Sequence, residues 1–357
     1  MAWDLLVDRS DLSRTEIVPV PTPEIAEGQV LLRVERVGMT ANNVTYAVFG
    51  DAMKYWDFFP AEAPWGRVPL WGFAVVEASD VAEVAVGTRL YGYLPTSSHV
   101  VVQPDGVDHR GFRDASPHRA HLPTPYNGLT TTTGDPAYEL EREDLQVLYR
   151  PLFMTSFMLA DFLEDNGLFG ASSVVISSAS SKTAYGTAFL LQGKVKTVGL
   201  TSQGNVAFTA SLGCYDEVLS YDDVAALPAV PTLYVDVAGN AALRRAVHEH
   251  MHDHLVHSAV VGAAHHTADP DLGGGARSLP GARPAFFFAP DQMCKRDVDW
   301  GPDGVEAGHA EAWRRFVPVV ENWVDVAVGQ GPAALQADWL EVLAGATDPR
   351  TGHVVRL

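Results

Sequence analysis

The sequence is poor in cysteine and in positive charge. Cys214 and Cys294 are the only cysteines among 357 residues, too few for a disulfide scaffold or for the four-cysteine lobe of a structural zinc site. Lysine and arginine number 25 against 44 acidic residues, which gives a formal charge of −19. A field of that sign repels phosphate backbones and anionic lipids, so we expect binding neither to nucleic acid nor to a membrane.

Long apolar runs are missing as well. No stretch approaches the roughly 18 apolar residues of a membrane-spanning helix, and charge already at Asp4 does not fit a signal peptide. These features predict a cytoplasmic protein. With 47% apolar and 19% charged residues, the chain has room for about two ordinary globular domains.

The first part of the chain predicts a small β-barrel. Short apolar strands over 29–37, 73–77, 88–93 and 99–102 are separated by glycine and proline. The polar segment 106–144 is predicted to be a long loop, of the kind that forms lids or binding segments.

Further along the chain, strands alternate with helices. Strands separated by helices of about ten residues imply a parallel sheet covered on both faces. A Gly-rich loop over 273–282 precedes a short edge strand over 284–289, and the tail from Ala307 is expected to hold two helices and a final strand. The expected elements before that loop are a helix over 145–163, strands over 173–178, 195–200, 216–219, 232–237 and 255–261, and helices over 183–193, 205–212 and 240–252.

Glycine is absent from a turn that normally requires it. Residues 172–186, SSVVISSASSKTAYG, are typical of a buried strand, a tight turn and a helix start, the arrangement that binds a dinucleotide pyrophosphate. Ser178, Ser181 and Ala184 occupy positions where such a turn usually has glycine. The order of elements favours a cofactor site, whereas the serine Cβ atoms would crowd a pyrophosphate.

A cation and several hydroxyl groups surround this turn. Lys182 falls in the first helical turn, where a cation opposes the helix dipole, and an anion would satisfy both this cation and the free backbone N–H groups. A solvated lysine beside a serine N-cap is the alternative. The candidate cofactor ligands are Ser178, Ser180, Ser181, Lys182, Thr183, Thr201, Ser202 and Asn205.

The end of the second strand of this unit bears on the choice of cofactor. NAD-specific sites usually place Asp or Glu there to bind the ribose diol. Here Leu200 is followed by Thr201, Ser202 and Gln203, without a carboxylate that would repel a 2′-phosphate. The sequence therefore favours NADP(H), and the alternative is a turn that only caps the next helix.

The order of a β-barrel, a nucleotide-binding sheet and a return segment resembles that of the medium-chain dehydrogenase/reductase superfamily. The resemblance implies an α/β protein with a GroES-like β-barrel catalytic domain over 1–144 and 298–357, and a doubly wound, Rossmann-like dinucleotide-binding domain over 145–297. The fragments that carry it are VLLRVERVG over 30–38, VGTRLYGY over 86–93, ASLGCYDEV over 210–218 and VDVAG over 235–239.

The catalytic zinc ligands of that superfamily are missing. Thr40 stands where zinc-dependent members have cysteine, and Phe73 and Ala74 follow Gly72 where they have His-Glu. None of these side chains can hold Zn²⁺. The chain therefore resembles the zinc-independent quinone and enone reductases, and we expect no metal.

The segment 40–46, TANNVTY, corresponds to the catalytic loop of the resembled family. Without a metal, neutral donors must stabilise a developing oxyanion, and Tyr46, Asn42 and Asn43 are the candidates. The alternative is that the asparagines shape a turn and Tyr46 packs in the barrel. Trp71, from an aromatic-rich segment, and Tyr126 are candidates for an apolar substrate pocket.

Two other clusters have competing interpretations. His248, Glu249 and His252 match the His-Glu-x-x-His zinc pattern within the histidine-rich segment 248–257, but they end an outer helix, so a solvated helix is favoured. Lys295 and Arg296 could grip a substrate carboxylate or a cofactor phosphate. Surface ion pairs with Asp297 and Asp299 are the alternative for these two cations.

Together these features predict a zinc-independent, NADP(H)-dependent reductase of an apolar carbonyl, enone or quinone. We also expect a homodimer joined through the edge strand 284–289, because its three consecutive phenylalanines place aromatic surface on both faces. The alternative is a non-redox lyase, hydrolase or small-ligand-binding protein on the same scaffold with a degenerate dinucleotide site, which the glycine-free turn supports.

Protein purified without a histidine tag is expected to contain well below stoichiometric zinc in elemental analysis, because Thr40, Phe73 and Ala74 replace the catalytic ligands. A stoichiometric metal that survives chelation would contradict this and would point to the segment 248–257.

Overall fold

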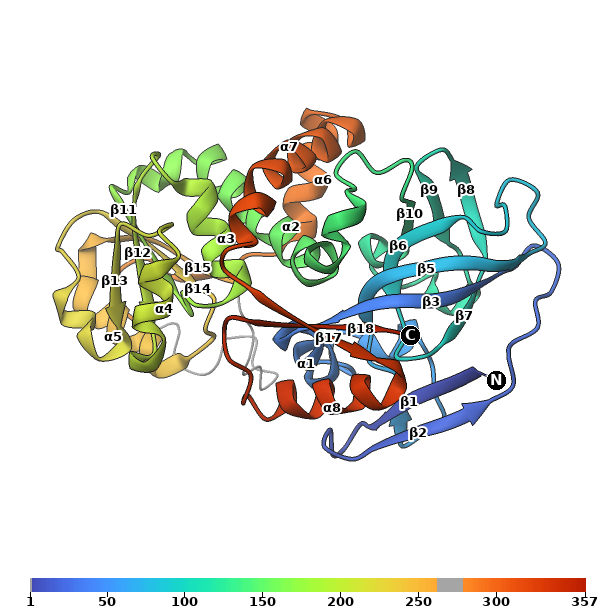
Figure 1. The fold of residues 1–357 in the computed structure, drawn as a ribbon. Helices are drawn as coiled ribbons and strands as arrows, with labels where there is room; N and C mark the ends of the chain where they lie inside the picture. The colour runs from blue at the N-terminus through green and yellow to red at the C-terminus, as the bar shows by residue number, and fades with distance from the viewer. Residues whose placement is uncertain (1, 262–278) are drawn as a thin grey trace. The chain divides into compact units, whose positions relative to one another are not determined.

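The computed structural model describes residues 2–261 and 279–357. The chain divides into two units, Met1–Leu148 with Val324–Leu357, and Tyr149–Trp323, drawn as ribbons in Figure 1. The chain thus returns to the first unit at residue 324, later than the expected residue 298. The reason is helix α7 (Pro302–Val320), whose Phe316 stacks on Phe153 with ring centroids 4.3 Å apart. The Gly-rich loop expected over 273–282 falls mostly outside the described residues.

The first unit is built from two sheets around an apolar core. The larger sheet has nine strands in the order β17-β18-β3-β5-β6-β10-β9-β8, with β7 also paired to β3, and the smaller has the order β2-β1-β4. Leu5, Leu32 and Leu90 are fully buried between them. The strands are β1 (Ala2–Asp8), β2 (Thr15–Val20), β3 (Val30–Met39), β4 (Trp65–Gly66), β5 (Leu70–Ser79), β6 (Arg89–Leu94), β7 (His99–Val102), β8 (Pro104–Asp108), β9 (Gly111–Asp114), β10 (Gly128–Thr131), β17 (Asp325–Gln330) and β18 (Thr351–Arg356).

Three of these strands lie in the segment predicted to be a long loop. β8 and β9 form a hairpin, and β10 pairs antiparallel with β9 and with β6. Each has only four or five residues, too short for an alternating pattern to stand out among threonine, proline and glycine. The prediction of one long loop over 106–144 was therefore wrong.

The expected catalytic loop is mostly a helix, α1 (Ala41–Val48). Thr40 and Asn43 form a capping box at its start: Asn42 N–H donates to Thr40 Oγ1 at 3.3 Å, and Thr40 N–H donates to Asn43 Oδ1 at 2.8 Å. This reciprocal cap satisfies backbone donors that a helix start leaves free. The other α-helix of this unit within the described residues is α8 (Gly331–Leu343).

The second unit has a parallel sheet of six strands in the order β13-β12-β11-β14-β15-β16. Counted from β11, this is the order 3-2-1-4-5-6 of a doubly wound dinucleotide-binding fold, so the predicted fold class is confirmed. No helix in the described part of the chain is long and apolar enough to cross a membrane. The strands are β11 (Ser173–Ser177), β12 (Lys196–Thr201), β13 (Glu217–Ser220), β14 (Thr232–Asp236), β15 (Leu255–Val260) and β16 (Pro284–Phe286). The remaining helices are α2 (Glu143–Asp165), which begins in the first unit, and α3 (Lys182–Leu191), α4 (Val206–Ser211), α5 (Ala241–Met251) and α6 (Ala289–Asp299).

Candidate functional site

The carboxyl ends of β11 and β14 lie side by side where the strand order reverses, which is the position of ligand sites in open α/β sheets. Ser177 joins the two strand ends. Its hydroxyl donates to Asp236 Oδ1 at 3.2 Å and accepts the N–H groups of Val237 and Ala238, each at 3.1 Å. The loop after β14 is thereby fixed to the last residue of β11.

Asp236 is fully buried and is paired on both oxygens. Oδ1 also accepts the N–H of Gly239 at 2.9 Å, and Oδ2 accepts Arg244 Nε at 2.7 Å. A buried carboxylate is tolerated only when it is paired and hydrogen-bonded in this way. Asp236 lies within the VDVAG fragment, but neither its role nor that of Ser177 is predicted from the sequence.

The turn after β11 keeps its shape without glycine. Ser178 adopts a left-handed backbone with φ of 53°, a conformation that costs a non-glycine residue about 1–2 kcal/mol. The next residue, Ala179, lies against β12 at Gly199, where an added Cβ would come within 2.9 Å of the Ala179 Cβ. Tyr215 Oη also donates to the Ala179 carbonyl at 2.9 Å. The glycine that makes room for the turn therefore lies in the neighbouring strand.

Three of the predicted cofactor ligands meet at Ser180. Its hydroxyl accepts Thr201 Oγ1 at 3.3 Å and Asn205 Nδ2 at 3.2 Å. The turn after β11 is thus connected to the segment that follows β12, while Ser202 is exposed beside it. No carboxylate follows β12 before α4 begins.

Helix α3 begins with unsatisfied donors. Ser181 is its N-cap residue, yet the side chain caps no N–H, and its buried Oγ has no hydrogen-bond partner within the described structure. The first N–H groups of a helix, here those of Lys182, Thr183 and Ala184, have no intrahelical acceptor. A buried hydroxyl and several N–H groups therefore converge where an anion is favoured.

Lys182 adds a cation that no carboxylate in the described part of the chain neutralises. Its half-buried side chain places Nζ 5.4 Å from the centre of the Tyr149 ring, and no acidic residue in the described ranges forms an ion pair with it. Tyr149 is in turn held by Tyr185, whose Oη donates to Tyr149 Oη at 2.8 Å. Burial lowers the pKa of Lys182 from 10.5 to about 8, because the protein replaces the water that would stabilise the charge.

In the first unit, the catalytic candidate Tyr46 and the substrate candidates Trp71 and Tyr126 meet in one aromatic cluster. Trp71 Nε1 donates to Tyr46 Oη at 3.2 Å, and the Tyr126 ring centroid lies 6.3 Å from that of Tyr46 and 6.2 Å from that of Trp71. Tyr55 joins them through its hydroxyl, 3.3 Å from Tyr126 Oη. Burial raises the pKa of Tyr46 well above its usual value, so Tyr46 remains a neutral O–H group.

The two asparagines of α1 differ in their contacts. The amide of buried Asn43 is committed to the protein, because Oδ1 accepts Thr40 N–H and Nδ2 donates to the Pro69 carbonyl at 2.9 Å. Half-buried Asn42 instead lies beside Tyr46 and acts to lower the pKa of its hydroxyl, against the larger effect of burial. Asn42 therefore remains a candidate for contact with a ligand, whereas Asn43 positions the helix.

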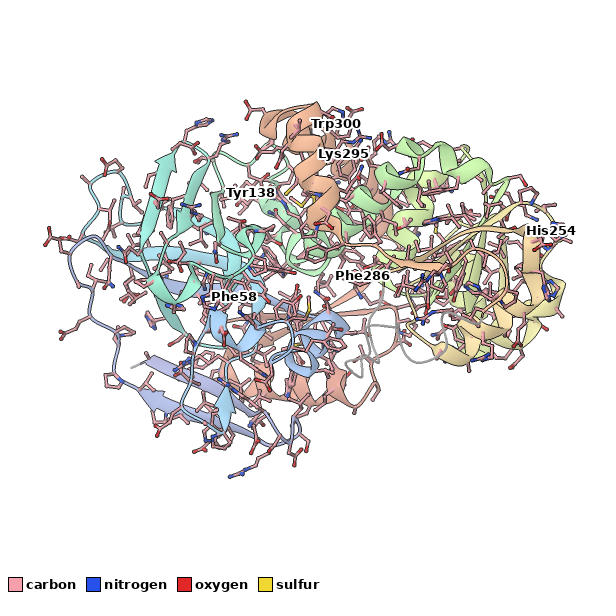
Figure 2. The ribbon with its side chains drawn as sticks, turned by 180° about the vertical axis from the view of Figure 1, so that it is seen from behind. Phe58, Tyr138, His254, Phe286, Lys295 and Trp300 are labelled. Atoms are coloured by element: carbon pink, nitrogen blue, oxygen red, sulfur yellow. The ribbon has the colours of Figure 1, made fainter. Side chains whose placement is uncertain are left out.

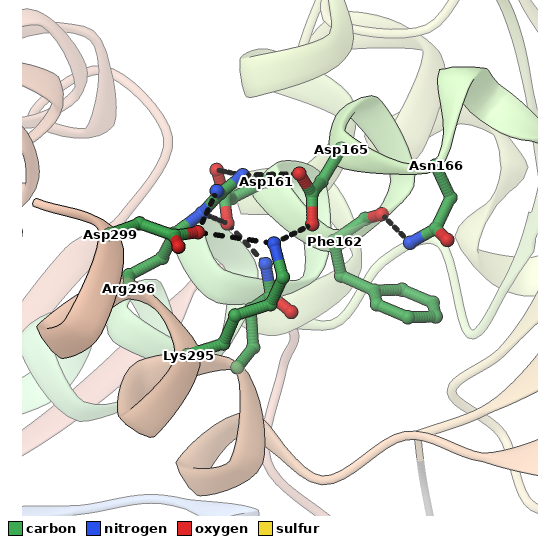
Figure 3. A network of polar contacts seen from close by, with 8 residues as sticks. Asp161, Phe162, Asp165, Asn166, Lys295, Arg296 and Asp299 are labelled. Atoms are coloured by element: carbon green, nitrogen blue, oxygen red, sulfur yellow. Dashed lines mark hydrogen bonds and ion pairs between the residues drawn. The ribbon is translucent and has the colours of Figure 1, made fainter.

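Lys295 and Arg296 hold α6 against α2, as Figure 3 shows. Arg296 Nε donates to Asp161 Oδ2 at 2.7 Å, and its Nη1 donates to Asp299 Oδ2 at 2.8 Å. Lys295 bonds Asp165 and Asp299, and the Arg296 guanidinium lies 4.5 Å from the ring centre of Trp300, which is labelled with Lys295 in Figure 2. These ion pairs with carboxylates of α2 and α6 favour the alternative of structural ion pairs over a role in substrate or phosphate binding.

The histidine segment is also structural where it is buried. His248 is fully buried and bonded on both nitrogens, with Nδ1 2.9 Å from the Pro280 carbonyl and Nε2 3.0 Å from Ser258 Oγ. The expectation of a solvated helix was wrong for this residue, because its ring packs against β15. His257 stacks on Phe169 with ring centroids 3.8 Å apart. Across residues 2–261 and 279–357, no three His, Cys, Asp or Glu side chains are placed to hold a metal ion.

Residues 37–348 match the model of a family described as "Protein of unknown function (DUF2855)", and the chain belongs to that family. No curated protein matches the sequence. Solved structures with the same fold include CurA from Vibrio vulnificus in complex with NADPH, which is 14% identical with a TM-score of 0.60 over 99% of this chain and 98% of that one.

Two further similar structures are the YhdH oxidoreductase from Salmonella enterica in complex with NADP and the quinone oxidoreductase from Thermus thermophilus, solved also with NADPH. The first is 16% identical with a TM-score of 0.56 over the whole of both chains. The second is 17% identical with a TM-score of 0.56 over 99% of this chain and 100% of that one. These likenesses confirm the predicted fold, a β-barrel domain with a doubly wound dinucleotide-binding domain.

Replacing Arg296 by methionine should destabilise the second unit by about 2–3 kcal/mol, because it leaves Asp161 without its charged partner. Lys295→Met, which removes a side chain that is 48% exposed, is the matched control and should cost less than about 1 kcal/mol. Urea unfolding measures both. Equal, small effects would show that the clamp between α2 and α6 contributes little to stability.

Proposed function

We propose that the protein is a zinc-independent, NADP(H)-dependent oxidoreductase that reduces an apolar carbonyl, enone or quinone. The observation that carries the proposal is the α3 start at the switch point of the sheet, where Ser181 Oγ is buried without a partner and Lys182 has no carboxylate among the described residues. The similar folds solved with NADPH or NADP, CurA, YhdH and the Thermus quinone oxidoreductase, support it.

The groups at this helix start suit a dinucleotide phosphate. The hydroxyl of Ser181, the backbone N–H groups of Lys182 and Thr183 and the Lys182 ammonium are all donors, and a phosphate has only acceptors to offer them. The end of β12 carries Thr201 and Ser202 instead of an acid, which leaves room for a 2′-phosphate. Ser181, Lys182 and Thr183 would hold the phosphates, with Thr201, Ser202 and Asn205 beside the ribose.

Bound NADPH would supply a hydride, and the residues of the first unit would prepare the acceptor. Tyr46 keeps its proton because burial raises its pKa, so it can donate a hydrogen bond to a developing oxyanion. Asn42 can contribute a second neutral donor. The rings of Trp71, Tyr55 and Tyr126 form an apolar surface that excludes water and suits a flat, apolar substrate.

One observation favours a non-redox protein as the second candidate. The Ser180 hydroxyl already accepts hydrogen bonds from Thr201 and Asn205. This part of the turn therefore needs no ligand to satisfy its polar groups. A lyase, hydrolase or small-ligand binder would retain the fold with a degenerate dinucleotide site. Absence of NADPH binding would select this alternative.

Lys182→Met tests the cofactor assignment. We expect the unmodified protein to bind NADPH more tightly than NADH, and the variant to bind NADPH about 10- to 100-fold more weakly, the effect of losing a charge-assisted hydrogen bond. Isothermal titration calorimetry measures both affinities. A variant that binds normally but unfolds earlier would show that Lys182 is structural.

The same lysine predicts a pH dependence. Because burial lowers the pKa of Lys182 to about 8, the cation is present below that pH and is lost above it. NADPH affinity should therefore fall as the pH rises from about 7 to about 9, and it should fall less in Lys182→Met. An equal fall in both proteins would assign the titration to another group.

Tyr46→Phe tests the reductase chemistry. Loss of the hydroxyl donor should lower kcat for quinone reduction by about 100-fold while leaving NADPH affinity unchanged. Tyr55→Phe removes a neighbouring hydroxyl that bonds Tyr126 and is the matched control, with a much smaller expected effect. Unchanged kcat in Tyr46→Phe would remove this tyrosine from the mechanism.

We also propose a homodimer formed through β16, the edge strand of the parallel sheet. Phe286 is 49% exposed there, whereas Phe287 is buried and its ring centroid lies 5.4 Å from that of Phe162. Phe286→Lys, rather than a change of Phe287, should therefore give a monomer in light scattering. Val298→Lys, at an exposed apolar site on α6, should not. A monomer at all concentrations before any substitution would exclude the dimer.

A further inference from the structure

The first unit contains a cavity that the proposed reductase chemistry does not use. Its volume is about 330 Å³, at the small end of the range for ligand pockets. It lies between the β1–β2 hairpin, β7 and the short helical turns at 55–58 and 117–119. Trp71, Tyr46 and Tyr126 are not among its lining residues, whereas Phe58 and Phe59 line the cavity and also pack in the aromatic cluster of Tyr46.

Arg119 is the unusual group in this cavity. Its side chain is 3% exposed, and its contact with a charged partner is Nε to Asp114 Oδ2 at 3.1 Å. Within the described residues, none of its five N–H groups makes a hydrogen bond of good geometry, and Nε is buried without one. A buried guanidinium whose donors are unused favours an added acceptor.

Asp114 cannot turn to satisfy that arginine further. Its Oδ1 already accepts the N–H groups of Gln103 and Ser116, each at 3.0 Å, and the Ser116 hydroxyl at 2.6 Å. The rings of Phe58 and Phe59 lie 5.5 and 4.6 Å from the Arg119 guanidinium carbon. Because the ion pair with Asp114 uses Nε, Nη1 and Nη2 remain for a ligand.

The second arginine of the cavity differs, because the protein satisfies it. Arg67 Nη2 donates to Asp4 Oδ2 at 2.6 Å, and its Nη1 bonds the Pro60 carbonyl. Asp4 is held in turn by the Ser97 hydroxyl at 2.6 Å. Asp4 and Asp114, the acids of the cavity, are thus each paired with an arginine. Arg119 is the arginine whose N–H donors remain available to a ligand.

The remaining walls are largely apolar. His99 and His118 also line the cavity and are already bonded, His99 Nδ1 to Ser98 Oγ at 2.9 Å and His118 Nε2 to the Phe58 carbonyl at 3.2 Å. Trp3, Val20, Phe59 and Val101 line the cavity together with prolines. Such walls suit the ring of a small aromatic molecule, and a carboxylate matches the planar donor edge of an arginine. We propose that this cavity binds a small aromatic carboxylate, with the ring between Phe59 and Val101 and the carboxylate on Arg119.

The test titrates the full chain with 4-fluorobenzoate or with its neutral counterpart 4-fluorobenzamide. Fluorine NMR measures the binding of each probe. The proposal predicts saturable binding of 4-fluorobenzoate, at least about tenfold tighter than that of 4-fluorobenzamide. Arg119→Gln should abolish the preference, and Val101→Trp, which fills the cavity and leaves the Arg119–Asp114 pair intact, should abolish binding of both probes.

Equal affinities for the two probes, or 4-fluorobenzoate binding that survives Val101→Trp, would overturn the proposal. If Arg119→Gln does not fold, as judged by circular dichroism, Val101→Trp decides alone: loss of binding supports the cavity, and retained binding rejects it. Lys182→Met, at the proposed cofactor site, should leave 4-fluorobenzoate affinity unchanged, so failure of the cofactor assignment would not affect this result.

Discussion

The buried carboxylate of Asp236 is the constraint on which the candidate cofactor site depends. An ion removed from water must be fully paired, and Arg244, Gly239 and Ser177 supply the partners of Asp236. Ser177 also accepts two backbone N–H groups of the loop after β14. The carboxyl ends of the two central strands are therefore held in one arrangement, and the turn that begins at Ser178 starts from a fixed point.

Given that fixed point, the chain obtains a nucleotide-binding turn by different means from a glycine-rich one. Ser178 accepts the strain of a left-handed backbone, and Gly199 of β12 provides the space that Ala179 needs. The surface presented to a ligand changes accordingly. Hydroxyl groups and Lys182 replace bare backbone, so charge and side-chain hydrogen bonds take a larger part in the proposed phosphate binding.

The sequence predicted the parallel sheet well because alternating strands and helices leave a strong local pattern. The residues around Ser180 could be predicted as neighbours because they follow the ends of two such strands. Features set by distant contacts were missed. Lys295 and Arg296 stand in sequence beside Asp297 but pair with Asp161 and Asp165, about 130 positions away. His248 was predicted to lie on a solvated helix. Its hydrogen-bond partner, Ser258, lies on the following strand, and the helical pattern alone does not show this contact. The capping box of Thr40 and Asn43 could have been predicted from the local sequence. It was missed because the segment was interpreted as the catalytic loop of the resembled family.

Hydrogen exchange of the backbone amides in 182–184, with and without saturating NADPH, tests the central claim directly. The N–H groups of Lys182, Thr183 and Ala184 begin α3 and have no intrahelical acceptors, so a phosphate bound there would slow their exchange. We predict protection that is centred on this segment, stronger with NADPH than with NADH. Protection that appears elsewhere, or none at saturating NADPH, would contradict the account.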